Sequence, residues 1–272
     1  MPLAFWIHHL NPFLGPHWGN LGIRYYGLSY ILGFLTAAGL LQYYSKRGIN
    51  PLPRERVGDL MVTLVFGVLL GGRLGYFLFY RFDLLQVDPL ALFRVWEGGM
   101  ASHGGMIGVT VALIWFSKSE KIPLLNLSDL VVCVAPAGLF FGRIANFING
   151  ELWGRISVMP WAVIFPQSAV EGTPVSMIPP RHPSQLYEAL LEGLVLYAIM
   201  WFYTRQARPT MAPTGMAVML YGCFRFFVEF FRMPDAHLGF IALDWLTMGQ
   251  LLSLPMIIIG AAMVYFAYRK PV

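Results

Sequence analysis

Long apolar stretches, separated by short polar connections, recur along this chain and limit what it can fold into. They cover residues 21–44, 58–80, 103–117, 128–148, 184–203, 214–231 and 246–268. A helix needs about 20 mainly apolar residues to cross a bilayer, and only 12% of the residues are charged, against about 25% in soluble domains. We therefore predict an all-α polytopic membrane protein of about seven transmembrane helices, with residues 1–272 forming a single membrane-embedded domain.

The third stretch, residues 103–117, is the shortest and begins among glycines. Gly98, Gly99, Gly104 and Gly105 surround its first residues. Backbone that is not helical is tolerated at membrane depth only where it is buried in protein. We therefore expect the outer end of this span to be irregular or re-entrant.

Basic residues predict the orientation of the chain. They fall in alternate connections and at the C-terminal end, as Lys46, Arg47, Arg54, Arg56, Lys118, Lys121, Arg205, Arg208, Arg269 and Lys270. Because cytoplasmic loops carry an excess of Lys and Arg, the C-terminus is predicted to be cytoplasmic and the N-terminus outside. Residues 149–183, between spans four and five, contain prolines and a strand-like segment at 161–165, and we expect them to form a small extracytoplasmic cap.

Three further features narrow the class of protein. The formal net charge is +5, but the basic residues are scattered singly, which argues against nucleic-acid binding. Cys133 and Cys223 are the two cysteines and both lie in apolar stretches, so we predict no disulfide framework and no Cys-rich metal site. The N-terminus has no basic region ahead of an apolar core, so we expect the first span to be retained.

Ionisable side chains within the apolar stretches point to a functional site. They are Arg73, Arg143, Glu188, Glu192, Arg225 and Glu229. Each costs about 2.5–3.5 kcal/mol in a span, so we expect them to face the bundle interior. With the orientation above, the outward halves of the spans hold Tyr25, Tyr26, Arg73, Tyr76, His103, Arg143, Asn146, Glu188, Arg225, Glu229 and Gln250. Each alone could be a snorkelling, packed or interfacial residue, but the shared depth favours a polar pocket open to the outer leaflet.

Helical spacing indicates what this pocket binds. Tyr221, Arg225 and Glu229 recur every four residues and share one helix face, and Arg143 and Asn146 share another. Arginine presents a planar fork of donors that matches phosphate or carboxylate oxygens. In the outer leaflet the abundant anions are phospholipid headgroups, so membrane lipids are the expected partners.

Glycines at four-residue spacing predict close helix packing. They are Gly67, Gly71 and Gly75 in one stretch and Gly138 and Gly142 in another. Small residues at this spacing let helix backbones approach each other. We interpret them as packing positions.

His103 is the candidate acid–base residue. It lies in a glycine-rich turn at the start of the third stretch, and an imidazole exchanges a proton near neutral pH. A histidine that is only hydrogen-bonded at the start of a helix remains an alternative. The sequence contains no H-E-x-x-H, C-x-x-C or G-x-S-x-G motif, which disfavours metal catalysis and a serine hydrolase.

Four motifs resemble those of the bacterial phosphatidylglycerol:prolipoprotein diacylglyceryl transferases. The longest is GRIANFINGELWGR at residues 142–155, and the others are HGG at 103–105, RHPSQLYE at 181–188 and YGCFRFFVEFFR at 221–232. The resemblance extends over essentially the whole chain, with no departure at the positions of the family's functional residues. It implies a multi-pass enzyme of the bacterial inner membrane with its active site toward the periplasm.

The resemblance implies transfer of a diacylglyceryl group from phosphatidylglycerol to the lipobox cysteine of a prolipoprotein. The products are a thioether and glycerol 1-phosphate, and no cofactor or metal is implied. His103 is then the candidate base, and Arg143 and Arg225 neutralise the departing phosphate. The resemblance places Tyr26, Asn146, Glu151 and Gly154 in the lipid-binding region, and we infer that Tyr221 and Glu229 orient Arg225. The cap would meet the membrane-inserted signal peptide of the precursor.

Two alternatives from other classes stay open. An anion transporter also uses intramembrane arginines, but its site should lie near the midplane with polar residues leading to both faces. A structural or assembly subunit would explain the packing glycines but not Arg143, Arg225 and His103 at one depth.

Overall fold

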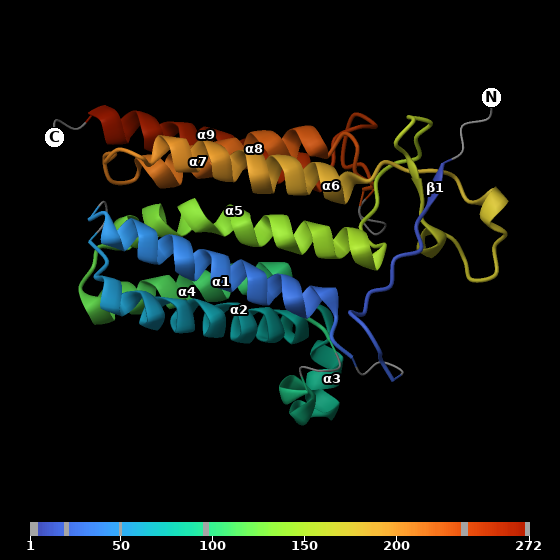
Figure 1. The fold of residues 1–272 in the computed structure, drawn as a ribbon, viewed down its shortest axis with the longest axis horizontal. Helices are drawn as coiled ribbons and strands as arrows, with labels where there is room; N and C mark the ends of the chain where they lie inside the picture. Colours follow the sequence, from blue (N-terminus) through green and yellow to red (C-terminus); the bar gives the residue numbers. More distant parts are fainter. Residues whose placement is uncertain (1–4, 19–21, 49–50, 95–97, 235–238, 270–272) are drawn as a thin grey trace. The chain divides into compact units, whose positions relative to one another are not determined.

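The computed structural model describes residues 5–18, 22–48, 51–94, 98–234 and 239–269, and these residues are mostly helical (Figure 1). The helices are α1 (Tyr25–Lys46), α2 (Val57–Tyr80), α3 (Phe82–Val87), α4 (Ser102–Glu120), α5 (Leu124–Asn149), α6 (Ser184–Glu188), α7 (Leu196–Tyr203), α8 (Ala212–Val228) and α9 (Met248–Arg269). A π-helical segment, Ala189–Val195, joins α6 to α7. Each of the seven predicted apolar stretches therefore contains a helix.

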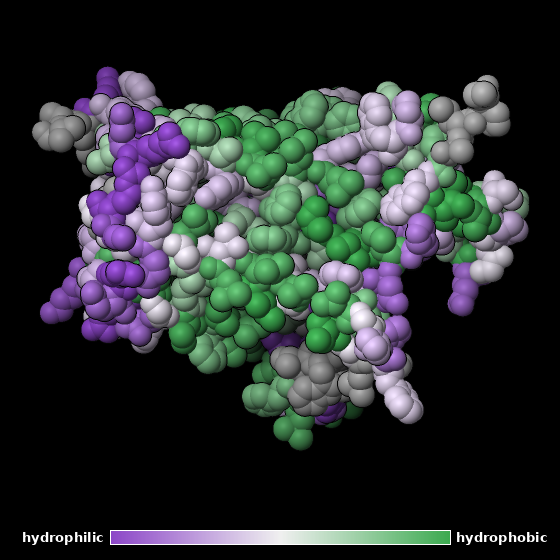
Figure 2. All heavy atoms as spheres, in the orientation of Figure 1, coloured by the Kyte–Doolittle hydropathy of each residue, from purple (hydrophilic) through white to green (hydrophobic). Residues whose placement is uncertain are grey.

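Among the described residues, four helical segments are both long enough and apolar enough to cross a membrane. They are Arg54–Tyr80, Leu124–Asn149, Ser184–Tyr203 and Met248–Arg269, and α8 is a shorter apolar helix. On the face drawn in Figure 2, hydrophobic residues cover the middle of the helices, and hydrophilic residues gather where α9 ends. The structure thus confirms a helical polytopic membrane protein, whereas seven spans remain a prediction.

The chain divides into two compact units, and the first holds most of the polar site. This unit comprises Met1–Ala37 and Val131–Val272. In it, strand β1 (Trp6–Ile7) pairs in parallel with β2 (Val163–Ile164), which lies within the predicted strand-like segment. The imidazole of His8 donates its Nε2 proton to the carbonyl oxygen of Phe147 over 2.7 Å. These contacts attach the residues before α1 to the end of α5 and to the long connection that follows it.

The second unit, Ala38–Leu130, is built on close packing of α2 against α4. A β-carbon added at Gly71 would lie 2.4 Å from the carbonyl oxygen of Gly104 and 2.6 Å from the Cα of Gly108. Gly67 and Gly75 make similar approaches to α4. The packing role predicted for the three α2 glycines is therefore confirmed, because only residues without side chains allow this separation.

The predicted packing role is wrong for Gly142 on α5. Among the described residues, nothing lies within 4 Å of a β-carbon added there. A β-carbon added at Gly138 also meets nothing within 4 Å among the described residues, but the backbone of Gly138 lies close to α1, since a β-carbon on Gly33 would lie 3.2 Å from the Cα of Gly138. Four-residue spacing on one helix does not reveal whether a neighbouring helix lies against that face.

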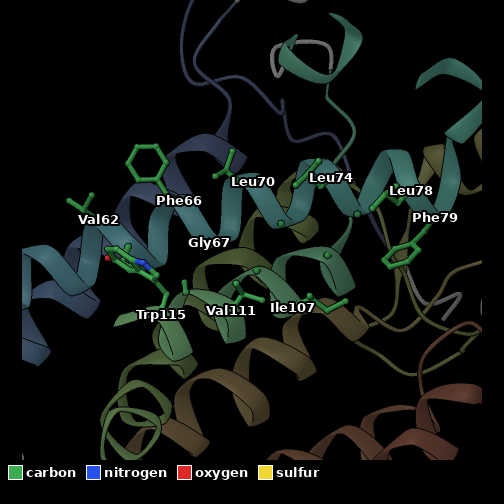
Figure 3. Close-up of a pocket in the computed structure, with 16 residues that line it drawn as sticks. Val62, Phe66, Gly67, Leu70, Leu74, Leu78, Phe79, Ile107, Val111 and Trp115 are labelled. Carbon is green, nitrogen blue, oxygen red and sulfur yellow. The ribbon is translucent and has the colours of Figure 1, made fainter. Parts of the chain in front are cut away.

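An apolar groove runs along the α2–α4 pair (Figure 3). Its volume is about 670 Å³, and it extends from Val62 to Phe79 on α2 and from Gly104 to Trp115 on α4. Thr63 is the one residue of its lining with a side-chain hydroxyl. The groove therefore offers no acid–base group, and it fits a surface that faces lipid tails.

The α2–α4 contact predicts the effect of one added methyl group. We expect Gly71→Ala to destabilise the protein by about 1–3 kcal/mol, because backbone atoms of α4 occupy the space that the methyl group needs. Gly105→Ala is the control, since a β-carbon there would lie 3.9 Å from its nearest neighbour. We expect this change to stay within about 1 kcal/mol. Thermal unfolding in detergent measures both, and equal melting temperatures would contradict the packing.

Candidate active site

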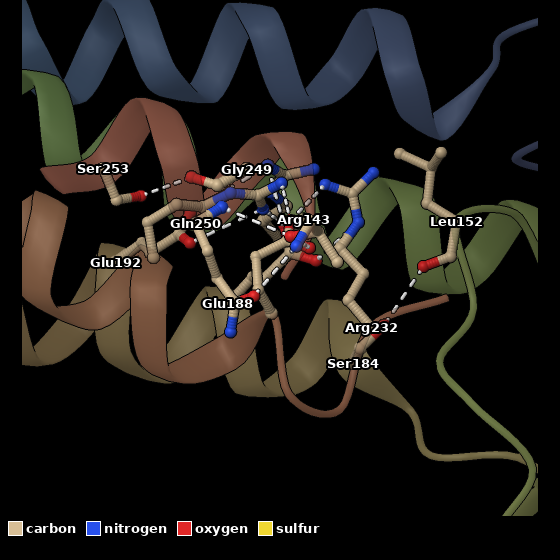
Figure 4. Close-up of polar contacts among 12 residues, drawn as sticks. Arg143, Leu152, Ser184, Glu188, Glu192, Arg232, Gly249, Gln250 and Ser253 are labelled. Atoms are coloured by element: carbon tan, nitrogen blue, oxygen red, sulfur yellow. Dashed lines mark hydrogen bonds and ion pairs between the residues drawn. The ribbon is translucent and has the colours of Figure 1, made fainter. Parts of the chain in front are cut away.

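Three arginines and three glutamates gather in the first unit, and we call them the arginine–glutamate cluster (Figure 4). They are Arg143 on α5, Glu188 on α6, Glu192 in the π-helical segment, Arg225 on α8, and Glu229 and Arg232 just after α8. All six side chains are at least four-fifths buried. Buried charges of this kind require mutual neutralisation.

Glu188 joins arginines from two different helices. Its carboxylate is fully buried, and its Oε2 lies 2.7 Å from Nη2 of Arg143 and 3.2 Å from Nη1 of Arg225. Its other oxygen lies 3.8 Å from Nε of Arg232. The guanidinium groups of Arg143 and Arg225, predicted to share one depth, therefore converge on one carboxylate. The sequence marks Glu188 as an ionisable residue within a span but does not reveal this bridging position.

Glu229 also forms an ion pair with Arg225. Its Oε1 accepts a hydrogen bond from Nη2 of Arg225, four residues earlier, and lies 3.5 Å from Nη1 of Arg232. Its Oε2 accepts a hydrogen bond of 2.9 Å from the hydroxyl of Thr247. This geometry agrees with an orienting role for Glu229. Tyr221 shares the helix, but among the described residues no hydrogen bond joins its hydroxyl to Arg225.

Three further predicted residues form one hydrogen-bonded group. The side-chain amide of Asn146, which is 3% exposed, donates to the hydroxyl of Tyr26 and to the carboxylate of Glu151, each over 2.8 Å. The amide of Gln185 donates to the carbonyl of Glu151 over 2.6 Å. Because Asn146 follows Arg143 by one helical turn on α5, this group lies beside the arginine–glutamate cluster.

Gly154 lies where the long connection meets the chain after α8. Its N–H donates to the carbonyl of His182 over 2.9 Å, and a β-carbon there would lie 2.5 Å from the carbonyl oxygen of Phe231. Burial lowers the pKa of His182 below its usual value. Nearby, the guanidinium of Arg155 donates to the backbone carbonyls of Arg232 and Glu229. Gly154 thus allows a tight backbone contact, a role that the sequence alone did not indicate.

His103 belongs to the second unit, where it lies exposed in the first turn of α4. The backbone before α4 is irregular, with φ of +81° at Gly98 and +83° at Gly99. The N–H of Ala101 donates to the carbonyl of Gly72 over 2.9 Å. The expected irregular start is therefore confined to residues before Ser102, and α4 itself is a continuous helix.

Arg73 secures this irregular segment. It is 5% exposed, and its guanidinium donates to the backbone carbonyls of Ala91, Leu92, Arg94, Gly98 and Gly99. These carbonyls lie on both sides of residues 95–97. Its depth predicts that Arg73 belongs to the polar pocket, but backbone carbonyls occupy its donors, so it positions the chain that leads to His103.

These contacts define a class of protein: a helical membrane protein with paired arginines that are held in place by buried carboxylates. The sequence model of the prolipoprotein diacylglyceryl transferase family matches residues 15–266. This chain therefore belongs to the prolipoprotein diacylglyceryl transferase family, and the resemblance seen in its motifs is confirmed.

Relatives in several bacteria carry the name phosphatidylglycerol–prolipoprotein diacylglyceryl transferase. A protein of Pseudomonas paraeruginosa is 47% identical over 93% of this chain and 92% of its own length. One from Coxiella burnetii is 47% identical over 96% of this chain and 97% of its own, and one from Pseudomonas putida is 49% identical over 93% of each. This chain spans nearly their full length.

The carbonyl contacts of Arg73 predict a local loss of order. We expect Arg73→Ala to destabilise the protein by about 3 kcal/mol, because buried carbonyls lose their donors, and to speed amide exchange at residues 98–101. Arg81→Ala is the control, since Arg81 makes an exposed ion pair of 3.4 Å with Asp83, which contributes within about 1 kcal/mol. Hydrogen exchange followed by mass spectrometry measures both. Unchanged protection of residues 98–101 in Arg73→Ala would contradict this role.

Proposed function

We propose that this chain transfers the diacylglyceryl group of phosphatidylglycerol to the lipobox cysteine of prolipoproteins. The reaction forms a thioether, releases glycerol 1-phosphate and is the first step of lipoprotein maturation. Membership of the family and the names of the relatives support the reaction. The observation that carries its mechanism is the convergence of Arg143 and Arg225 on Glu188. No metal or cofactor is part of the proposal.

The paired arginines suit the phosphate of a lipid headgroup. The side chains of Arg143 and Arg225 are 19% and 14% exposed, so neither is completely closed off. Glu188 and Glu229 hold them in place before the lipid binds, which lowers the cost of ordering these long side chains. As the bond between the glycerol carbon and the phosphate oxygen breaks, the phosphate gains one negative charge, and preorganised donors stabilise it.

The nucleophile is the thiol of the precursor's cysteine. A free thiol has a pKa of about 8.5, so roughly 3% is thiolate at neutral pH, and a base that accepts its proton speeds the attack. His103, exposed at the start of α4, is the proposed base. In one step the sulfur–carbon bond forms, the carbon–oxygen bond to phosphate breaks, and the thiol proton passes to the imidazole.

The group around Asn146 is the proposed remainder of the lipid site. Because the Tyr26 hydroxyl accepts a hydrogen bond from Asn146, its own proton is directed away and can be donated to a headgroup oxygen. Glu151 holds the other amide proton of Asn146. Gly154 keeps the long connection close to the end of α8. Tyr221 and Glu229 are the proposed residues that orient the side chain of Arg225.

The proposed topology has seven spans, an outer N-terminus and a cytoplasmic C-terminus in the bacterial inner membrane. Arg143 lies near the end of α5, Glu188 near the start of the next helical segment, and Arg225 near the end of α8. These helical segments thus carry the cluster at one end. The basic residues lie in the connections at the opposite end, which is predicted to be cytoplasmic, so the cluster is proposed to face the periplasm. Residues 149–183 are the proposed extracytoplasmic cap that receives the signal peptide.

A reconstituted reaction tests the function. Purified protein in detergent, given phosphatidylglycerol and a lipobox peptide, should lipidate the peptide, which neither a transporter nor an assembly subunit would do. We expect His103→Ala and Arg143→Ala to lower kcat/KM at least about 100-fold, since acid–base and charge-stabilising groups contribute this much. Arg143→Lys should also lose at least about tenfold, because an ammonium lacks the planar fork.

Arg81→Ala is the matched control, as it removes an exposed arginine without altering the site. Wild-type rates in both His103→Ala and Arg143→Ala would contradict the mechanism. Absence of lipidated peptide with the folded wild-type protein would overturn the proposed activity itself.

A further inference from the structure

The charges of the arginine–glutamate cluster raise a problem for binding an anion. Arg143, Arg225 and Arg232 supply three positive charges, and Glu188, Glu192 and Glu229 supply three negative charges when all are ionised. Such a cluster is neutral. A phosphodiester brought into it would leave one uncompensated negative charge in a site screened from water, and an unpaired buried charge is costly.

Glu188 and Glu229 each accept a hydrogen bond from Arg225 through one oxygen, although the other oxygen of Glu188 has no hydrogen-bond partner among the described residues. Glu188 Oε2 accepts a hydrogen bond from Arg225 and lies 2.7 Å from Arg143. Glu229 accepts from Arg225 through one oxygen and from Thr247 through the other. Guanidinium groups therefore contact both of these carboxylates directly.

Glu192 differs from both. Its side chain is fully buried, yet its oxygens come no closer to a guanidinium than 3.8 Å at Arg225 and 3.9 Å at Arg143. Neither oxygen has a hydrogen-bond partner in the described part of the chain. The groups that face it are Arg143 from α5, Tyr221 and Arg225 from α8, Arg232 beyond α8, and the like-charged Glu188 one turn earlier. Burial without hydrogen bonds, next to another carboxylate, disfavours the ionised form.

We propose that Glu192 holds a proton when the lipid headgroup binds, so that the cluster then carries one net positive charge that matches the phosphodiester. The proposal rests on the proposed function and adds a positioning residue for charge rather than a group that touches the reacting atoms. The π-helical segment Ala189–Val195 supports it, since such segments occur frequently at functional sites. They bring side chains to positions that a regular α-helix would not offer.

Infrared spectroscopy reads the proton directly. The full chain, reconstituted in phosphatidylglycerol nanodiscs near neutral pH, should show the C=O stretch of a protonated carboxyl group. This band should disappear in Glu192→Gln and in Glu192→Met, a second neutral variant in case the first does not fold. It should persist in Glu171→Gln, which alters a glutamate of the connection before α6. A band that survives both Glu192 variants, or that is absent from the wild type, overturns the proposal.

Kinetics then test whether this proton serves the headgroup. Over the pH range in which the infrared band disappears, we expect KM for phosphatidylglycerol to increase at least about tenfold in the wild type, because the cluster loses its net positive charge. The Glu192→Gln profile should lack this increase, since an amide cannot ionise. The same increase in Glu192→Gln would overturn the link to binding. The infrared measurement needs no turnover, so a failure of this proposal can be told apart from a failure of the proposed transferase activity.

Discussion

The arrangement of the site depends on the fully buried carboxylate of Glu188. It lies between guanidinium groups of α5 and α8, which would otherwise repel each other in a poorly solvated setting. Removing one partner from such a buried group costs about 3–5 kcal/mol. The same carboxylate that stabilises this part of the bundle therefore also holds both guanidinium groups against one of its oxygens.

Neighbouring segments of the chain are attached to the arginine–glutamate cluster by further contacts. Asn146 continues from Arg143 along α5 and ties Tyr26 and Glu151 to the cluster. Arg155 and Gly154 fasten the long connection to the backbone after α8. Each contact restricts side chains in advance, which in the proposed reaction lowers the cost of ordering them when the lipid binds.

The sequence predicted the helices and many of the site residues because apolar length and buried charge are strong local signals. Helical spacing predicted that Arg225 and Glu229 share a face, and shared depth predicted that Arg143 lies at the same level. The structure brings Arg143 and Arg225 to Glu188, and Glu229 to Arg225. The sequence could not show that Arg73 binds five backbone carbonyls, because no spacing in it brings Ala91, Leu92, Arg94, Gly98 and Gly99 to one side chain. Nor could it separate Gly71, where an added β-carbon would collide with α4, from Gly142, where it would meet no described neighbour within 4 Å.

The most direct test of the account is a structure of this protein with phosphatidylglycerol bound in a nanodisc. We predict that oxygens of one lipid phosphate lie within about 3.2 Å of both Arg143 and Arg225, while Glu188 still bridges the two guanidinium groups. A phosphate bound elsewhere, or contacted by only one of these arginines, would contradict the central claim.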